Sequence, residues 1–399
     1  METIELIPQM TFAIASKNNF RYVKHAVKYI RENCYRKNHV IHIGIDGEDT
    51  ELEDWVKEQI QNGDTNIMVS NGVSGIAAIY NNIAKKLSTD FIVIYHADMI
   101  AGKDMDLYLY KQWQKGLIVS ATRVEPPLHP ADPSKIVENF GLWPEEDVED
   151  GFKRTEWDRF VEHIAYDSEK VTKGVFAPWL IHKEDYWAVG GHDETLNSHS
   201  EDRDLFNRFL LNGFDFVQPW SALVYHLTCR GGQFQDGVDK VTEDPAFHKM
   251  KNKAFRNYVR KWGCFVRNDE YQYPIIPHKY NVRFDIENCT PDVFQFLEPW
   301  CTNINVDLPS NIIDEYIDAE QPNTQIDLND KINNSSSNND VVVKFNASGI
   351  TNESVNFIVK LAEIFDANEL EVGNYDFHPF SIEVKKVKHY EQNLVNCKN

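Results

Sequence analysis

The sequence predicts an α/β protein in which a mostly parallel sheet is flanked by helices and followed by a smaller α/β module. Two observations lead to this prediction. The first hundred residues alternate between apolar runs and amphipathic helical patterns, and the composition changes near residue 268. With 399 residues, 42% of them hydrophobic, the chain is long enough for two domains and too apolar to be disordered throughout. We therefore expect one domain over residues 1–268 and an accessory domain over residues 269–399.

The alternation is clearest before residue 100. Four apolar runs predict strands, at residues 10–15, 40–45, 66–69 and 91–95. Helical patterns separate them: the first places Val23, Ala26, Val27 and Ile30 on one face, and the others cover residues 50–60 and 74–87. Strands that alternate with helices favour a parallel sheet, in which ligands bind beyond the C-terminal ends of the strands.

From residue 116 onward the pattern is weaker. Residues 116–123 predict a strand, and the stretch that follows, to about residue 173, is interpreted as a loop that covers the substrate. Residues 247–262 predict a basic helix that ends at Gly263. The predicted accessory domain contains an Asn/Ser-rich loop at 333–339, a helix at 352–365 and strands at 341–345, 370–372 and 381–387.

The chain is strongly acidic, with 41 Lys+Arg against 62 Asp+Glu and a net charge of −21. Such a surface repels phosphate backbones and anionic lipids, so it disfavours nucleic-acid partners, whereas acidic sites favour divalent cations. No run approaches the roughly 20 apolar residues that span a bilayer, and the first ten residues lack a secretory pattern. The six cysteines form no C-x-x-C pair, so we expect free thiols and a cytoplasmic protein.

Polar side chains stand where the predicted parallel strands end. They are Ser16, Lys17, Asp46, His96 and Asp98. A carboxylate at such an edge is a suitable ligand for a hard cation, although Asp98 taken alone is more often an acidic residue that caps a turn. Asp46, beside Gly47, is by itself only a turn residue. Because ligands bind at this edge, the five residues are candidates for a binding site.

Two further candidates lie later in the chain. Ser198 and Glu201 fit a capping box before an apolar helix, and Asp202 suits a first helical turn because its charge opposes the helix dipole. The same helix terminus would present fixed carboxylates to a crevice. His226 ends an apolar run, where a single His is usually structural, although a neutral imidazole also binds metals.

Together, these motifs resemble those of the family 2 glycosyltransferases, which have the GT-A fold. The resemblance covers about residues 9–265 and rests on residues 45–50, 81–98, 189–194 and 200–205. The last two stretches read V-G-G-H-D-E and S-E-D-R-D-L, and four matching residues follow them: Arg208, Gly213, Pro219 and His226. This order resembles the family's G-G-x-D-E … E-D-x-D-L-x-x-R … G … P … H run, the most specific part of the pattern.

The resemblance implies roles on the donor side of a site. Asp46 matches the residue that accepts a hydrogen bond from the donor base, commonly uracil, and Ser16 and Lys17 flank the nucleotide. Asp98 matches the direct metal ligand of the D-x-D motif, and His226 a position that sometimes completes the metal site. The expected cofactor is Mn²⁺ or Mg²⁺, and the expected donor is a nucleotide-diphosphate sugar.

The resemblance also implies an acceptor side. Asp202 matches the catalytic base, Glu201 its neighbour near the acceptor, and His199 belongs to the same stretch. Trp179 lies just before this region, and its indole suits either stacking on a sugar or burial in the core.

Two positions depart from the family pattern. His96 replaces the first Asp of D-x-D, which puts the usual ribose contact in doubt. Tyr80 stands where the family often has Arg before Asn81.

The implied reaction is metal-dependent, inverting transfer of a sugar to a carbohydrate or glycoconjugate hydroxyl. Three other interpretations remain open: a GT-A-like carbohydrate-binding protein without activity, a nucleotidyltransferase, and a transferase that places a sugar on a modified DNA base. The residues after the first predicted strand, Ala15 to Asn19, form no Gly-rich phosphate loop, which argues against the nucleotidyltransferase. The sequence specifies no oligomeric state.

Overall fold

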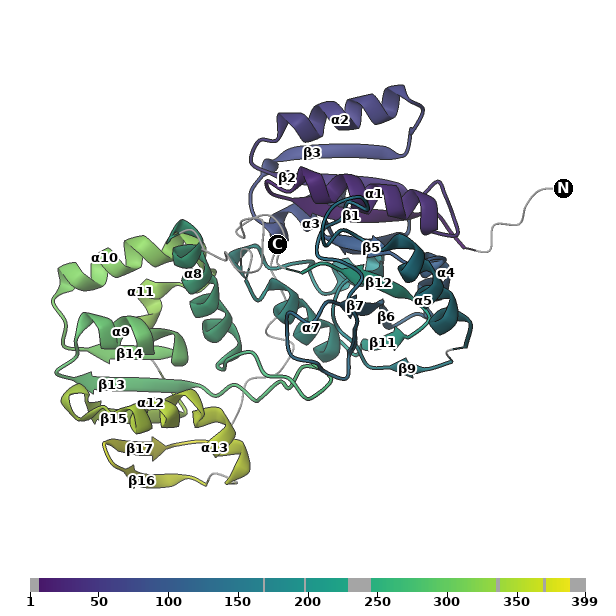
Figure 1. Ribbon diagram of the computed structural model, residues 1–399. Coiled ribbons are helices and arrows are strands. Elements are labelled where there is room, and N and C mark those ends of the chain that lie inside the picture. The colour runs from purple at the N-terminus through teal and green to yellow at the C-terminus, as the bar shows by residue number, and fades with distance from the viewer. Residues whose placement is uncertain are drawn as a thin grey trace.

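The computed structural model describes residues 7–167, 169–196, 199–228, 245–334, 338–368 and 371–387 (Figure 1). An eight-stranded sheet of order β3-β2-β1-β4-β10-β6-β11-β9 forms the centre of the N-terminal part. Four parallel strands occupy one half of it: β1 (Met10–Ser16), β2 (Val40–Asp46), β3 (Ile67–Val73) and β4 (Phe91–His96). The helices between them are α1 (Phe20–Asn33), α2 (Thr50–Gln61) and α3 (Ile76–Lys85). The predicted α/β class and the order of its first seven elements are confirmed.

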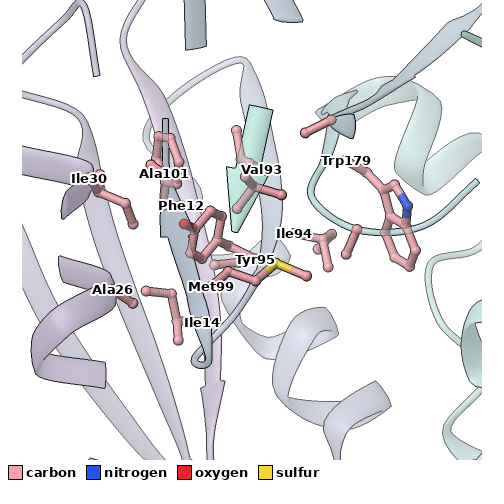
Figure 2. Close-up of a cluster of buried hydrophobic side chains, with 14 of the residues drawn as sticks. Phe12, Ile14, Ala26, Ile30, Val93, Ile94, Tyr95, Met99, Ala101 and Trp179 are labelled. Carbon is pink, nitrogen blue, oxygen red and sulfur yellow. The ribbon is translucent and has the colours of Figure 1, made fainter. Parts of the chain in front are cut away.

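Apolar periodicity explains why these elements pack as they do. Ala26 and Ile30 lie on the buried face of α1, and Figure 2 shows them beside Phe12 and Ile14 of β1 in one hydrophobic cluster. On β2, Gly44 permits the close approach of α3, because a Cβ at this position would lie 2.3 Å from the side chain of Ile79. Tight packing on the sheet therefore fixes the strand ends, where the polar candidates stand.

The second half of the N-terminal part mixes strand directions. It adds antiparallel β10 and β9 to the large sheet and forms a separate four-stranded sheet of order β5-β12-β7-β8. The strands here are β5 (Met99–Ala101), β6 (Leu117–Ser120), β7 (Thr122–Glu125), β8 (Lys135–Val137), β9 (Val171–Thr172), β10 (Trp179–His182), β11 (Asp215–Pro219) and β12 (Leu223–His226). The helices are α4 (Met105–Gln112), α5 (Arg154–Asp167), α6 (Lys183–Ala188), η1 (Glu194–Leu196) and α7 (Glu201–Leu211).

Two predictions for this half need correction. The single strand predicted at 116–123 is two strands, because β6 pairs with β11 in the large sheet and β7 pairs with β12 in the small one. The stretch interpreted as a covering loop contains the 14-residue helix α5. Its buried residues Trp157, Val161 and Ala165 recur every fourth position, and Trp157 packs against Tyr225 of β12.

The C-terminal part has its own sheet and core. The five strands have the order β14-β13-β15-β17-β16, and β13, β14 and β15 are parallel. They are β13 (Val282–Glu287), β14 (Asn303–Val306), β15 (Val341–Asn346), β16 (Gly373–Phe377) and β17 (Phe380–Val384). Its helical elements are α9 (Pro291–Leu297), η3 (Glu298–Trp300), α10 (Ser310–Glu320), η4 (Gln321–Asn323), α11 (Leu328–Lys331), η5 (Ala347–Gly349), α12 (Asn352–Val359) and α13 (Leu361–Ala367).

The predicted elements of this part are confirmed only in outline. The helix predicted at 352–365 is divided at Lys360 into α12 and α13. A strand was predicted at 370–372, but residue 370 lies outside the described residues and β16 begins at Gly373. The predicted Asn/Ser-rich loop includes residues 335–337, which are likewise outside the described residues.

Helix α8 (Pro245–Trp262) lies beside the C-terminal part and ends before Gly263, as predicted (Figure 1). Consecutive residues of α8 form ion pairs with elements on either side. Arg260 contacts Glu298 at 2.6 Å, whereas Lys261 contacts Asp193 at 2.8 Å and Asp204 at 2.7 Å. The domain boundary near residue 268 remains a prediction.

Two further properties bear on the expected environment of the chain. Among the helices that the structure describes, none combines the length and apolar character of a membrane span. Four of the six cysteines lie in the described residues, and all four are free thiols: Cys34, Cys264, Cys289 and Cys301.

Candidate active site

The C-terminal ends of β1, β2 and β4 meet at one edge of the large sheet. The strand register pairs Ser16 with Ile45 and Ala15 with His96, so Ser16, Asp46 and His96 end neighbouring strands. Asp46 is held on both carboxylate oxygens: Ser74 Oγ lies 2.8 Å from Oδ1 and Lys17 Nζ lies 3.1 Å from Oδ2. This geometry fixes a carboxylate at the edge, while about half of the Lys17 side chain (51%) stays accessible.

Ser16 has a different position from Lys17. It is buried, and its hydroxyl donates a hydrogen bond of 2.7 Å to Asn19 Oδ1 at the start of α1. Ser16 therefore shapes the turn after β1, and the more accessible groups at this end of the edge are Lys17 and Asp46.

Next to this end, three side chains form a cluster that suits a metal ion. His96, Asp98 and His226 each offer one ligand atom, and the three atoms lie within 4.8 Å of one another. The cluster joins the two sheets, because β12 pairs with β5 in a register that sets His226 opposite Met99. Two imidazole nitrogens and a carboxylate oxygen form a donor set that fits a divalent transition metal, and the carboxylate is the part of the set that Mn²⁺ favours.

A buried ionic group behind His226 supports the cluster. Glu125, only 2% exposed, accepts bonds from Arg123 at 2.7 Å and Lys135 at 2.8 Å, and it lies 2.9 Å from His226 Nδ1. A carboxylate at Nδ1 orients the imidazole and directs Nε2 towards Asp98, 3.5 Å away. Sequence reasoning missed Glu125; the available signal was an acidic residue at the end of the strand T-R-V-E, two residues after a basic one.

The charges of the cluster are strongly coupled. Burial alone would lower the pKa of His226, but Asp98 and Glu125 together raise it to about 9. Burial alone would raise the pKa of Asp98, but His226 and His96 hold it below its usual value. Burial lowers the pKa of His96 to about 4, so this imidazole is neutral at pH 7 and available as a ligand.

Glu201 and Asp202 open helix α7 on the other side of the candidate site. The residue before them, Ser200, has a left-handed backbone with φ of 64° and makes no side-chain capping bond. The predicted capping box includes Ser198, which lies outside the described residues. Burial, with the adjacent charge of Asp202, raises the pKa of Glu201 to about 8.

The cluster and the α7 carboxylates lie close enough to act on the same groups. Burial lowers the pKa of His96, whereas the negative charges of Asp98 and Asp202 both act to raise it. Glu201 and Asp98 both raise the pKa of the buried phenol of Tyr80. His96 therefore lies within electrostatic range of both Asp98 and Asp202, and Tyr80 lies within range of both Asp98 and Glu201.

The G-G-H-D-E loop, residues 190–194, has a structural role. Gly191 has φ of 70°, and a Cβ there would lie 2.5 Å from Asn81 Oδ1. The Asn81 amide donates to the His192 carbonyl at 2.9 Å and to Glu194 at 2.8 Å. Asp193 pairs with Lys261, so both acidic residues of this motif bind neighbouring protein groups.

The acceptor-side candidates have mixed outcomes. Trp179 is 3% exposed, packs edge-on against Phe206 and donates its indole N–H to the Val175 carbonyl. It is a core residue with no free face for a sugar, which corrects its assignment as an acceptor contact. The backbone N–H of His199 donates to the Leu196 carbonyl just before α7, and an acceptor role for His199 stays a prediction.

Comparison with known proteins gives structural likenesses only. No protein-family model matches the chain, and no curated protein matches it. Similar solved structures include GalNAc-T7 with UDP, GalNAc and Mn²⁺, at 14% identity, a TM-score of 0.45, and coverage of 64% of this chain and 48% of that one. Another is the mannosyltransferase PcManGT from Pyrobaculum calidifontis in complex with GDP-Man and Mn²⁺, at 11% identity, a TM-score of 0.41 and coverage of 64% of both chains. S. aureus TarS 1-349 matches at 12% identity and a TM-score of 0.39, over 55% of this chain and 60% of that one.

The chain thus spans about half the length of GalNAc-T7 and under two thirds of the other two. At TM-scores below 0.5 these likenesses decide nothing about the site.

Proposed function

We propose that the protein is a metal-dependent glycosyltransferase of the GT-A type, which moves a sugar from a nucleotide-diphosphate donor to an acceptor hydroxyl. One observation carries the proposal. A cluster of His96, Asp98 and His226 and the carboxylates of Glu201 and Asp202 act on common neighbours at the C-terminal edge of a parallel sheet. Membership of family 2 and inversion of the sugar are part of the proposal.

The donor side would be formed by Asp46 and the cluster. Asp46, held by Lys17 and Ser74, offers a fixed acceptor for the N–H of a nucleotide base, with uracil as the expected base. Asp98 and His226 would hold the divalent cation, with His96 as a further ligand, and binding at His226, whose pKa is about 9, would release the proton of that imidazole. When bound, a divalent cation neutralises the negative charge that develops on a leaving diphosphate.

On the acceptor side, Asp202 would take the proton of the attacking hydroxyl. The acceptor oxygen forms a bond to the anomeric carbon as the bond from that carbon to the diphosphate oxygen breaks. The proton passes to the Asp202 carboxylate and the electron pair leaves with the nucleoside diphosphate. Attack from the face opposite the leaving group inverts the anomeric centre. Glu201, protonated at neutral pH because of its pKa of about 8, is suited to donate a hydrogen bond to the acceptor.

The test is release of nucleoside diphosphate from UDP- and GDP-sugars in the presence of Mn²⁺. Asp202→Asn should lower turnover about 100-fold or more while donor binding, followed by thermal shift, stays within about twofold. The matched control is Asp54→Asn, an exposed carboxylate on α2. Donor binding without any release would favour the inactive carbohydrate-binding protein. Release of pyrophosphate would favour a nucleotidyltransferase.

A further inference from the structure

A hollow lies at the C-terminal edge of the accessory sheet. It has a volume of about 540 Å³, within the range of about 300–1,000 Å³ that is common for small-molecule sites. Its lining is the last part of each of the three parallel strands and the residue that follows β14: residues 285–287, 305–307 and 344–346. No other segment of the described chain lines it.

The topology explains why a hollow forms at this place. After β13, the chain passes to β14 on one side and then returns to β15 on the other, so the direction of the connections reverses at β13. In open α/β sheets, ligands bind in the crevice at such a reversal, outside the carboxyl ends of the strands. The accessory sheet therefore has the geometry of a binding site, independently of the candidate active site.

Strand composition supports the same conclusion. The register aligns Asp285 of β13 with Asn305 of β14 and Lys344 of β15, which makes a polar row across three strands. Glu287 and Asn346 form the next row on the same face. Asp and Asn are depleted in strands, so their concentration at one set of strand ends calls for a reason other than sheet formation.

Charge balance selects the kind of ligand. The Asp285 carboxylate is paired with Arg283 at 3.0 Å and accepts from the Asn305 amide at 2.7 Å. Asp307 accepts the backbone N–H groups of two residues after β13, at 2.7 and 2.8 Å. In the described part of the chain, the exposed side chains of Glu287 and Lys344 have no hydrogen-bond or ion-pair partner, and the backbone N–H groups leave the negative charge of Asp307 in place, so two carboxylates and one ammonium of the lining lie outside ion pairs.

This remaining set does not suit a charged ligand. Lys344 would repel a cation, and Glu287 and Asp307 would repel a phosphate. A carboxylate, an ammonium and amides together offer both donors and acceptors, which complements the neighbouring hydroxyl groups of a sugar.

We propose that the hollow at the strand ends of β13, β14 and β15 binds a neutral saccharide. The ligand class follows from the lining alone. If the proposed function holds, this saccharide would be part of the acceptor, and only this last step rests on the proposed function. The aromatic ring that lines the hollow, Phe345, is 6% exposed, so hydrogen bonds supply most of the contact and the affinity is weak, with a Kd on the order of 1 mM.

The experiment is saturation-transfer NMR on the full chain with maltotriose, cellotriose and chitotriose as neutral probes. Inorganic phosphate and Ca²⁺ serve as charged competitors. At least one trisaccharide should bind, and the variant Glu287→Ala/Lys344→Ala should weaken its binding about tenfold. The matched control Glu353→Ala/Lys385→Ala removes one carboxylate and one ammonium from exposed positions of the same part of the chain, and should leave binding unchanged.

Three results would overturn the proposal: no binding of any trisaccharide, equal loss in the variant and the control, or displacement of the saccharide by phosphate or Ca²⁺. The outcome is separable from that of the proposed function. Saccharide binding at the hollow in a chain that releases no nucleoside diphosphate would refute only the transferase. Transfer activity without saccharide binding at the hollow would refute only this inference.

Discussion

The two parallel-strand edges of this protein use charge in opposite ways. At the edge of the large sheet, His96, Asp98 and His226 are largely buried, and their pKa values are shifted by burial and by each other. At the edge of the accessory sheet, Glu287 and Lys344 are exposed and lack partners among the described residues. Burying ionisable groups costs free energy unless they are paired, hydrogen-bonded or bound to a metal, whereas exposed groups cost little. The difference separates a centre suited to chemistry from one suited to reversible binding.

The largest expected effect concerns the cation. Asp98→Asn should abolish the rise in Tm that Mn²⁺ causes and lower turnover at least about 100-fold, because the carboxylate is the only anionic ligand in the cluster. Asp285→Asn, the corresponding change at the accessory edge, should leave the Mn²⁺ response intact. Excess chelator should abolish turnover, and Mn²⁺ should restore it. Full activity in excess chelator would contradict the role of the cation. An equal loss of the Mn²⁺ response in Asp285→Asn would show that the two edges do not differ in cation binding.

The next effect tests how much a buried ion pair between α8 and the C-terminal part contributes to stability, compared with an exposed one. Glu298 is fully buried and contacts Arg260 at 2.6 Å and Lys331 at 2.7 Å. Glu298→Gln leaves buried cations without their counter-charge and should lower the free energy of unfolding by about 3 kcal/mol. Asp54→Asn, which breaks an exposed pair with Lys57, should change it by less than about 0.5 kcal/mol. Denaturant unfolding followed by tryptophan fluorescence measures both, and equal effects would contradict the role of burial.

The smallest expected effect is a pH dependence at Glu201. Its pKa, raised to about 8 by burial and by Asp202, means that the folded protein binds this proton more tightly than the unfolded chain does. The resulting stabilisation is complete below about pH 4.5 and is lost as the pH rises through 8. Glu201→Gln should therefore raise Tm by about 5 °C at pH 9 and by little at pH 4.5.

Glu287→Gln is the matched control for this prediction, because Glu287 is exposed at the accessory edge. It should shift Tm by less than about 1 °C at either pH. Asp202 and the phenol of Tyr80 are the ionisable neighbours of Glu201, so the double variant with Asp202→Asn should retain less of the pH-dependent gain. A gain that is the same at pH 4.5 and pH 9 would show that the variant acts through packing instead of charge.

The first seven elements of the large sheet and its helices could be predicted from the spacing of apolar residues, because these elements pack against one another through their apolar faces. The strand ends at Asp46 and Asp98 were predictable for the same reason, since parallel topology brings C-terminal ends together. His226 was placed beside Asp98 by the motif order, and the structure brings the two within 3.5 Å.

What escaped prediction depends on contacts between distant segments. The group of Glu125, Arg123 and Lys135 lies on two strands of the small sheet, and local patterning does not distinguish a buried ion network from an exposed charged strand. Helix α5 was missed because its buried face is marked by Trp157 and Val161 among acidic neighbours, which weakens the apolar period. The burial of Trp179 likewise depends on Phe206, a residue 27 positions later in the sequence.

The adjacency of Arg260 and Lys261 on α8 has a consequence for shortening this chain. Excision of the residues after about 270 would remove Glu298 and Glu320, the counter-charges of Arg256 and Arg260, while Lys261 remained attached to Asp193 and Asp204. The fragment that remains would thus carry two guanidinium groups without counter-charges on the helix whose Lys261 contacts Asp204 in the first turn of α7. A shortened chain should therefore also replace Arg256 and Arg260 by neutral, apolar residues. These replacements would remove the two cations that lose their partners when the C-terminal part is deleted.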